Sequence, residues 1–548
     1  MVNTKKYFRL TIDSCVMDSM LTFLTVVKDC VVSYPLTAGN VINDETGHYK
    51  SDGRIAATVT VTCLTSICFA LIGVFANIQI ENNIAYVVTW ALGETIVIFA
   101  IVALIWISVL AYKNTDSWYQ EDYHPKGRKE GAKIVITFLW IFGVATIVDK
   151  SIELSIDIEC LNGNLTIADP TFSKRWHWVF TDIAHIVFYC IQLGFFSYFM
   201  RYKLGNHLAI NYGVLSVLLT NAVQWFISLM DDVNDYYKKG QIPGLVEDPC
   251  FWDSWILKKV MVALHPYLSP AMIEFFLLSA GLILGMLPSD STEEIPQLNA
   301  IESSELIPLL HNEQSDIHLE RTHEKHPATY FLFVTFITVV NIILTIANII
   351  FTKVSPESYA TFCTLVVADA VYKLLMLSAI MVIYYRIYKF GHQQQNHGSL
   401  SSGQYLFLLT TTGTIGIGVI GVIGGIQFSD LKGYLYTTNN IFDIFLTVWQ
   451  SILIIHIERI VLTEPQGRLI PSELLCFYLA ICNFVYWAVD SFINVTYVES
   501  NHVSGWIVSA NQWENIQEML APMLIFYRFH TFLDWYVVYC RLKQTNSV

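Results

Sequence analysis

APMLIFYRFHT, residues 521–531, is the stretch from which the architecture of this chain follows. It places Arg528 and His530 inside an otherwise apolar run, where an ionisable side chain is costly in a membrane and marks a functional site by default. A second stretch, SPAMIEFFLL at 269–278, is similar to it half a chain earlier, with Pro270 followed four residues on by Glu274. The two prolines and their polar neighbours indicate a duplicated membrane protein.

The composition is that of a chain that faces lipid and protein more than water. Of 548 residues, 54% are apolar and only 14% are charged, about half the charged fraction of a soluble domain. Apolar runs of about 20 residues, enough to cross a bilayer, recur twelve times. The sequence therefore predicts an all-α polytopic membrane protein with twelve transmembrane helices. The expected spans are 55–78, 84–112, 132–154, 177–200, 207–230, 262–287, 330–351, 359–388, 405–427, 439–462, 472–494 and 514–540.

Several function classes are excluded by what the sequence contains. The net charge of −14 lies largely in loops, above all at 289–320, and indicates no nucleic-acid binding. Eleven cysteines are spread singly, without the CxxC pairs of metal or redox sites. No phosphate-binding glycine loop, HExxH or GxSxG motif occurs, so an enzyme is not expected. The glycines of GTIGIGVIGVIGG at 413–425 indicate close helix packing.

The distribution of basic residues predicts the orientation. An even number of spans puts both termini on one side, and the short loops on that side hold Lys126, Arg128 and Arg201 among others. The positive-inside rule places this side in the cytoplasm. On the outer side lie the glycosylation sequon at Asn164 and two cysteines, Cys160 and Cys250, which an oxidising face would allow to form a disulfide. The sequence leaves open whether that bond forms.

The chain divides into two halves that carry the same polar markers. We expect a cytoplasmic N-terminal segment at 1–54, a six-helix half at 55–287, an acidic cytoplasmic linker at 288–329, a second six-helix half at 330–540 and a cytoplasmic tail at 541–548. Recurrence of markers in the same order at equivalent spans predicts two pseudo-repeated halves in parallel arrangement. The matched markers are Gln192 with Gln450, Asn221 and Trp225 with Asn483 and Trp487, and Pro270 with Pro522.

The glutamines and asparagines of this repeat allow two readings. Gln192, Gln450, Asn221 and Asn483 either clamp neighbouring helices by hydrogen bonds, a common use of polar groups in membranes, or line a pathway, and both roles are compatible. With about 100° per residue, Asp232 projects within about 40° of Asn221 and shares its polar stripe.

Glu274 and the two ionisable residues of the opening stretch are candidates for proton chemistry. Desolvation disfavours an ionised carboxylate among apolar residues, so Glu274 could hold and release a proton; alternatively it is a neutral acid bonded to a backbone carbonyl. His530 projects about 40° from the position equivalent to Glu274, which Phe526 occupies, whereas Arg528 points about 160° away from His530. We expect His530 to accept protons and Arg528 to anchor to a carboxylate on a neighbouring helix.

Other ionisable residues within spans have structural alternatives. Asp182 and His185 form either an outer pH-sensing pair or a solvated helix end, and His265 is a weaker candidate for outer pH sensing. Asp369 and Lys373 are four residues apart, and we expect them to neutralise each other.

The chain resembles the otopetrins, a family of proton channels with twelve helices in two six-helix halves. The resemblance rests on YLSPAMIEFFLL, GVLSVLLTNAVQW, CNFVYW, the helices of Gln192 and Gln450, and above all LIFYRFH. It implies acid-activated proton permeation, homodimeric assembly, block by zinc, association with sterol-like lipids and no cofactor. The family's functional positions carry over to Glu274, Asn221, Asn483, Gln192, Gln450, Arg528 and His530, and less firmly to Asp232.

The chain departs from the family pattern in its first half. Ser216 stands where a family histidine is expected, Ser269 where a tyrosine precedes the proline, and Phe275 where a tyrosine follows the glutamate. These losses remove titratable or hydrogen-bonding groups, so the first half is expected to conduct or gate differently, or not to conduct.

The sequence thus predicts a proton-selective channel of the plasma membrane, opened by extracellular acid and carrying H⁺ into the cell. Its partners would be protons, membrane lipids and a second copy of the chain, without nucleic acid. The alternative is a proton-coupled secondary transporter of a small solute. Such transporters contain matched helix breaks, for which only Pro270 and Pro522 qualify.

Overall fold

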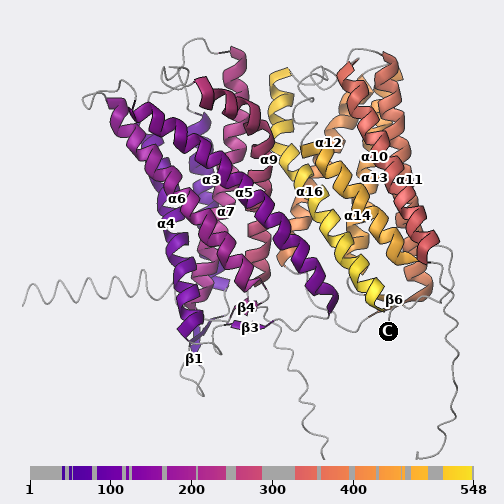
Figure 1. Cartoon of the computed structure of the whole chain (residues 1–548), viewed down its shortest axis with the longest axis horizontal. Coiled ribbons are helices and arrows are strands. Elements are labelled where there is room, and N and C mark those ends of the chain that lie inside the picture. The colour runs from indigo at the N-terminus through magenta and orange to yellow at the C-terminus, as the bar shows by residue number, and fades with distance from the viewer. Residues whose placement is uncertain are drawn as a thin grey trace, which may run out of the picture.

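The computed structural model describes twelve long helices and three short two-stranded sheets, and Figure 1 shows their arrangement. The described residues are 40–42, 49–51, 54–76, 83–113, 119–121, 126–162, 170–200, 202–204, 208–241, 255–286, 327–354, 359–393, 402–427, 431–457, 460–462, 471–491 and 510–545. The helices are α3 (Arg54–Ala76), α4 (Asn83–Lys113), α5 (Lys126–Asn162), α6 (Pro170–Phe199), α7 (Leu208–Gln241), α9 (Trp255–Met286), α10 (Pro327–Val354), α11 (Tyr359–Phe390), α12 (Ser402–Gln427), α13 (Leu431–Ile457), α14 (Ser472–Val489) and α16 (Ala510–Thr545).

Each of the twelve expected spans coincides with one of these helices. Within the described residues, nine helices contain a stretch that is long and apolar enough to cross a membrane. The chain is therefore a multi-pass helical membrane protein.

The expected span 439–462 is wrong at its end. Helix α13 begins at Leu431 and ends at Ile457, and residues Ile460–Leu462 form strand β6 instead. The apolar run Ile460-Val461-Leu462 looks like the end of a helix by hydropathy. Its backbone pairs with strand β5 (Gly391–Gln393), a partner distant in sequence that hydropathy cannot detect.

The three strand pairs are antiparallel and join segments that precede or follow helices. Strand β1 (Asn40–Ile42) pairs with β2 (Tyr49–Ser51) before α3, and β3 (Tyr119–Glu121) pairs with β4 (Tyr202–Leu204). β3 and β4 follow α4 and α6, just as β5 and β6 follow α11 and α13. Strands β1, β3, β4 and β6 lie at the end of the molecule where the C-terminus also lies (Figure 1).

The helices form two adjacent groups, α3 to α9 and α10 to α16 (Figure 1). Within the first group α4 packs on α6 and α7, α5 on α6 and α9, and α7 on α9. Within the second group α11 packs on α13 and α14, α12 on α13 and α16, and α14 on α16. Each of these contacts in the first group thus has a counterpart in the second.

Aromatic side chains fill the space where the two groups meet. Phe138 and Phe142 of α5 lie 5.0 and 5.2 Å from the ring of Phe529 on α16, both edge-on. Phe142 also lies 5.7 Å from the ring of Trp487 on α14. Such aromatic contacts contribute beyond the area they bury, so α5 joins the two groups.

The glycines of α12 allow close helix packing, as the sequence predicts. A methyl group at Gly418 would lie 2.7 Å from Cγ1 of Ile444 on α13, and one at Gly413 would lie 2.8 Å from Cβ of Met523 on α16. Both distances are shorter than van der Waals contact, so α12 approaches each neighbour only because these side chains are absent.

Candidate functional site

Two glutamine–asparagine pairs with the same geometry lie in the two groups of helices. In the first, Gln192 Nε2 on α6 donates to Asn221 Oδ1 on α7 at 2.9 Å. In the second, Gln450 Nε2 on α13 donates to Asn483 Oδ1 on α14 at 3.0 Å. All four side chains are fully buried. The clamping role expected for these residues is confirmed, whereas a pathway role stays a prediction.

Each asparagine also bonds to its own helix. Its Nδ2 donates to the backbone carbonyl four residues earlier, Val217 for Asn221 at 2.9 Å and Leu479 for Asn483 at 2.8 Å. These bonds fix the amide orientation, so each glutamine meets an oriented partner.

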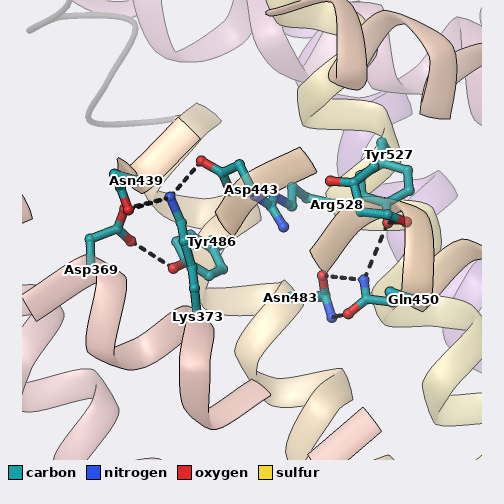
Figure 2. Close-up of polar contacts among 10 residues, drawn as sticks. Asp369, Lys373, Asn439, Asp443, Gln450, Asn483, Tyr486, Tyr527 and Arg528 are labelled. Atoms are coloured by element: carbon teal, nitrogen blue, oxygen red, sulfur yellow. Dashed lines mark hydrogen bonds and ion pairs between the residues drawn. The ribbon is translucent and has the colours of Figure 1, made fainter. Parts of the chain in front are cut away.

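The second pair extends into a larger polar cluster around Tyr527 of α16 (Figure 2). The Tyr527 hydroxyl accepts hydrogen bonds from Gln450 at 3.5 Å and Ser451 at 3.2 Å and donates to the carbonyl of Thr447 at 3.2 Å. Aligning Pro270 with Pro522 places Phe275 at the position of Tyr527 in the first group. Phenylalanine has no hydroxyl, and aligning Gln192 with Gln450 places Leu193 at the position of Ser451, so the first cluster lacks two polar groups of the second.

A ring of charged and polar side chains lies beside this cluster (Figure 2). We call Asp369, Lys373, Asp443, Tyr486 and Arg528 the charge ring. Lys373 Nζ lies 2.6 Å from Asp369 and 2.5 Å from Asp443, and Arg528 lies 3.0 Å from Asp443. The guanidinium of Arg528 lies 4.6 Å from the centre of the Tyr486 ring, and the Tyr486 hydroxyl donates to Asp369 at 2.6 Å.

The charge ring confirms two predictions. Arg528 does anchor to a carboxylate on a neighbouring helix, that of Asp443 on α13. Asp369 and Lys373 do pair as expected, and Lys373 also binds Asp443. The spacing of four residues revealed the first pair, whereas the link to Asp443 joins helices far apart in sequence.

Glu274 is buried in α9 with 1% of its surface exposed. Among the described residues, neither carboxyl oxygen of Glu274 makes a hydrogen bond of ordinary geometry. The expected alternative, a bond from this acid to a backbone carbonyl, is therefore wrong within the described residues. The indole N–H of Trp487, on α14, lies close enough to interact with this carboxyl. Glu274 of the first group therefore faces a residue of the second.

Phe526, at the position equivalent to Glu274, has the reciprocal surroundings. It packs with Ile273 and Leu277 of α9 in a small apolar cluster against which Trp225 of α7 also packs. Trp225 is the counterpart of Trp487 in the sequence repeat. The two tryptophans thus border equivalent positions of the opposite group, one with an acid and one with a phenyl ring.

His530 lies between two aromatic rings, 5.3 Å from Phe526 and 5.9 Å from Phe407. Its Nδ1 atom is buried and has no hydrogen-bond partner within the described residues. The apolar surroundings distinguish His530 from Arg528 two residues earlier, which agrees with the opposite directions expected from helix geometry.

The first group holds its own ionisable residues at the middle of α6. Asp182 and His185 are 5% and 6% exposed, so the alternative of a solvated helix end is wrong. His185 Nε2 lies 3.0 Å from Gln224 Nε2 on α7, and His265 Nδ1 lies 3.2 Å from Asp149 on α5. Sequence reasoning did not single out Asp149, because its partner is 116 residues away.

Other expected site residues cannot be placed. The side chains of Asp232 and Cys160, and all of Asn164 and Cys250, lie outside the described residues. Within the part of the chain that the structure describes, no three His, Cys, Asp or Glu residues are grouped so that they could hold a metal ion.

Comparison with protein families agrees with this geometry. The sequence model of the family named Otopetrin matches residues 244–529, just over half of the chain. The chain is a member of the otopetrin family. The match includes Glu274, the charge ring and the Gln450–Asn483 pair, and it ends one residue before His530. A search of curated proteins found no match. Otopetrins are proton channels, and membership implies proton channel activity in general for this otopetrin rather than enzymatic activity.

Proposed function

We propose that this otopetrin is a proton-selective channel of the plasma membrane that extracellular acid opens and that carries H⁺ into the cell. The observation that carries the proposal is the polar column of the second group of helices. There the charge ring lies beside the hydrogen-bonded cluster of Gln450, Asn483 and Tyr527, among otherwise apolar helices (Figure 2). Buried polar groups in membrane helices are costly and mark ion pathways.

We further propose that the two groups of helices are repeated halves, with twelve membrane crossings and both termini in the cytoplasm. Support comes from the matching Gln–Asn pairs and from the matching positions of the β3–β4 and β5–β6 strand pairs. An even number of crossings places the segment before α3 and the C-terminus on the same side of the membrane. Figure 1 shows β1 and the C-terminus at the same end of the molecule.

In this proposal Glu274, Asp232 and His530 relay protons or set the local potential, and the amides order the water between them. The halves contribute unequally, because Phe275 offers no hydroxyl where Tyr527 bonds to Gln450 and Ser451. His185 and His265 contact polar partners in the first half, and with Asp182 they are candidates for sensing external acid.

The structure does not favour the alternative of a proton-coupled transporter. Helix α9 continues through Pro270 and helix α16 continues through Pro522. The two prolines therefore do not produce the unwound segments that would bind a solute at mid-membrane.

Whole-cell recording during steps of external acid tests the proposal. We expect an inward current whose reversal potential follows the proton gradient, and we expect Glu274→Gln and His530→Ala to reduce it at least tenfold. Thr412→Ala, at an exposed position of α12, is the matched control and should conduct like the parent. A reversal potential that follows sodium or chloride would refute the channel proposal, and unchanged currents in both variants would refute the relay.

A further inference from the structure

We infer that the charge ring selects which ions enter the second group of helices, admitting protons while excluding metal cations and anions. The inference rests on the proposed function, because it assigns ion selectivity to one place on the proton path. It concerns residues for which the preceding argument gives only structural contacts.

The ring is built around Asp443, which lies between two fixed cations. One carboxylate oxygen lies 2.5 Å from Lys373 Nζ and the other 3.0 Å from Arg528 Nη2. Asp369, the second carboxylate, accepts from Lys373, from Tyr486 and from Asn439 Nδ2 at 2.7 Å. Two carboxylates balance two cations, and four helices, α11, α13, α14 and α16, each supply at least one member.

The carboxylates and the cations differ in their access to the surroundings. The side chains of Lys373 and Arg528 are each 4% exposed, whereas those of Asp369 and Asp443 are 29% and 25% exposed. A charged carboxylate facing hydrocarbon would be very costly. The accessible sides of both carboxylates therefore require water, with the cations behind them.

Few other ionisable groups act on the ring. Helix α14 is followed by Asp490, whose charge acts on Arg528, and α13 itself contributes Tyr436 near Asp443. Helix α12, which also packs on α13, contains no Asp, Glu, Lys, Arg or His. The charge seen by an entering ion is therefore set mainly by the ring.

This arrangement treats a proton differently from other ions. A metal cation that meets the accessible sides of the carboxylates would be repelled by Lys373 and Arg528, which are tethered to their helices behind them. An anion would first meet the two carboxylates. A proton instead arrives on a hydronium ion, which becomes water as an O–H bond forms on Asp443 and one of the ion pairs of Asp443 breaks. That O–H bond then breaks as the proton passes to a second water molecule beside the Gln450–Asn483–Tyr527 cluster, which becomes hydronium, and the ion pair forms again.

The sign of the permeating ion should follow the charge of the ring. With equal pH on both sides and a sodium chloride gradient, the parent should carry almost no current. Lys373→Gln removes a positive charge and should raise the sodium-carried current at least tenfold. Asp443→Asn removes a negative charge and should give a chloride-carried current. The double variant Lys373→Gln/Asp443→Asn balances the charges again and should carry neither ion.

Surface density of each variant must be measured alongside the currents. Single variants that reach the surface and keep the parent's selectivity would overturn the inference, as would two variants that admit the same ion. If a single variant does not reach the surface, a double variant that admits sodium or chloride would equally overturn it. A parent without proton current, together with a sodium current in Lys373→Gln, would refute the proposed function but support the ring.

Discussion

At the scale of single residues, the two halves differ most clearly at the pair Phe275 and Tyr527. Both rings are fully buried at equivalent places after the proline of their helix. Only Tyr527 completes a hydrogen-bonded cluster, with Gln450, Ser451 and the carbonyl of Thr447. The counterparts of Tyr527 and Ser451, Phe275 and Leu193, are apolar, so this polar layer is connected in the second half and interrupted in the first.

Removing the hydroxyl of Tyr527 should impair the second half. Tyr527→Phe removes the hydrogen bonds to Ser451 and to the Thr447 carbonyl, each of which contributes about 0.5–1.5 kcal/mol of stability, and the proton current per surface channel should fall several-fold. Current density and thermal unfolding in detergent measure the two effects. Tyr405→Phe, at an exposed position of α12, should change neither, and a Tyr527→Phe channel with parental current would contradict the role of the cluster.

Adding the oxygen to the first half is the reciprocal change. In Phe275→Tyr the new hydroxyl should reach the Gln192–Asn221 pair, as Tyr527 reaches Gln450, and the proton current should increase. The increase should vanish when Gln192 is also replaced by leucine. A Phe275→Tyr variant that folds without any gain in current would show that the hydroxyl is not what the first half lacks.

At the scale of helices, α12 depends on its glycines. Gly418→Ala would place a methyl group 2.7 Å from Ile444, and overpacking of this kind typically costs about 1–3 kcal/mol. We expect a lower apparent Tm of the purified protein. Gly194→Ala on α6 is the matched control, because no atom lies within 4 Å of the added carbon. It should be neutral or stabilising, since alanine favours a helix over glycine by about 1 kcal/mol; equal losses in both variants would contradict the packing argument.

The sequence predicts helices better than their ends or their partners. Long apolar runs identify all twelve described helices, because a helix that crosses a bilayer needs about 20 mostly apolar residues. Hydropathy misplaces the end of α13, because pairing of β6 with β5 depends on a segment about 70 residues earlier. Within the site, spacing of four residues reveals Asp369 with Lys373, and helix geometry turns Arg528 away from His530. The link from Arg528 to Asp443 and the facing of Glu274 and Trp487 depend on how helices pack, which no local pattern records.

At the scale of the whole molecule, α5 and α16 join the two groups through aromatic contacts. Co-expressing residues 1–300 and 301–548 as separate chains should therefore give two fragments that purify together, because the cut lies between α9 and α10 and breaks no described contact. Phe138→Ala removes edge-on contacts with Phe529 and Phe532 and should reduce the recovered pair several-fold. Phe331→Ala, at an exposed site on α10, is the control; recovery that is equally high with Phe138→Ala would show that other contacts hold the groups together.

Two strand pairs hold helix ends together at one end of the molecule. The β3–β4 pair connects the C-terminal ends of α4 and α6, and the β5–β6 pair connects those of α11 and α13, through backbone hydrogen bonds. These helices have more freedom to separate at the opposite end. Asp369 of the charge ring lies nearer to the start of α11 than to its tied end, so a small tilt of α11 about the tied end would change the spacing of the charge ring.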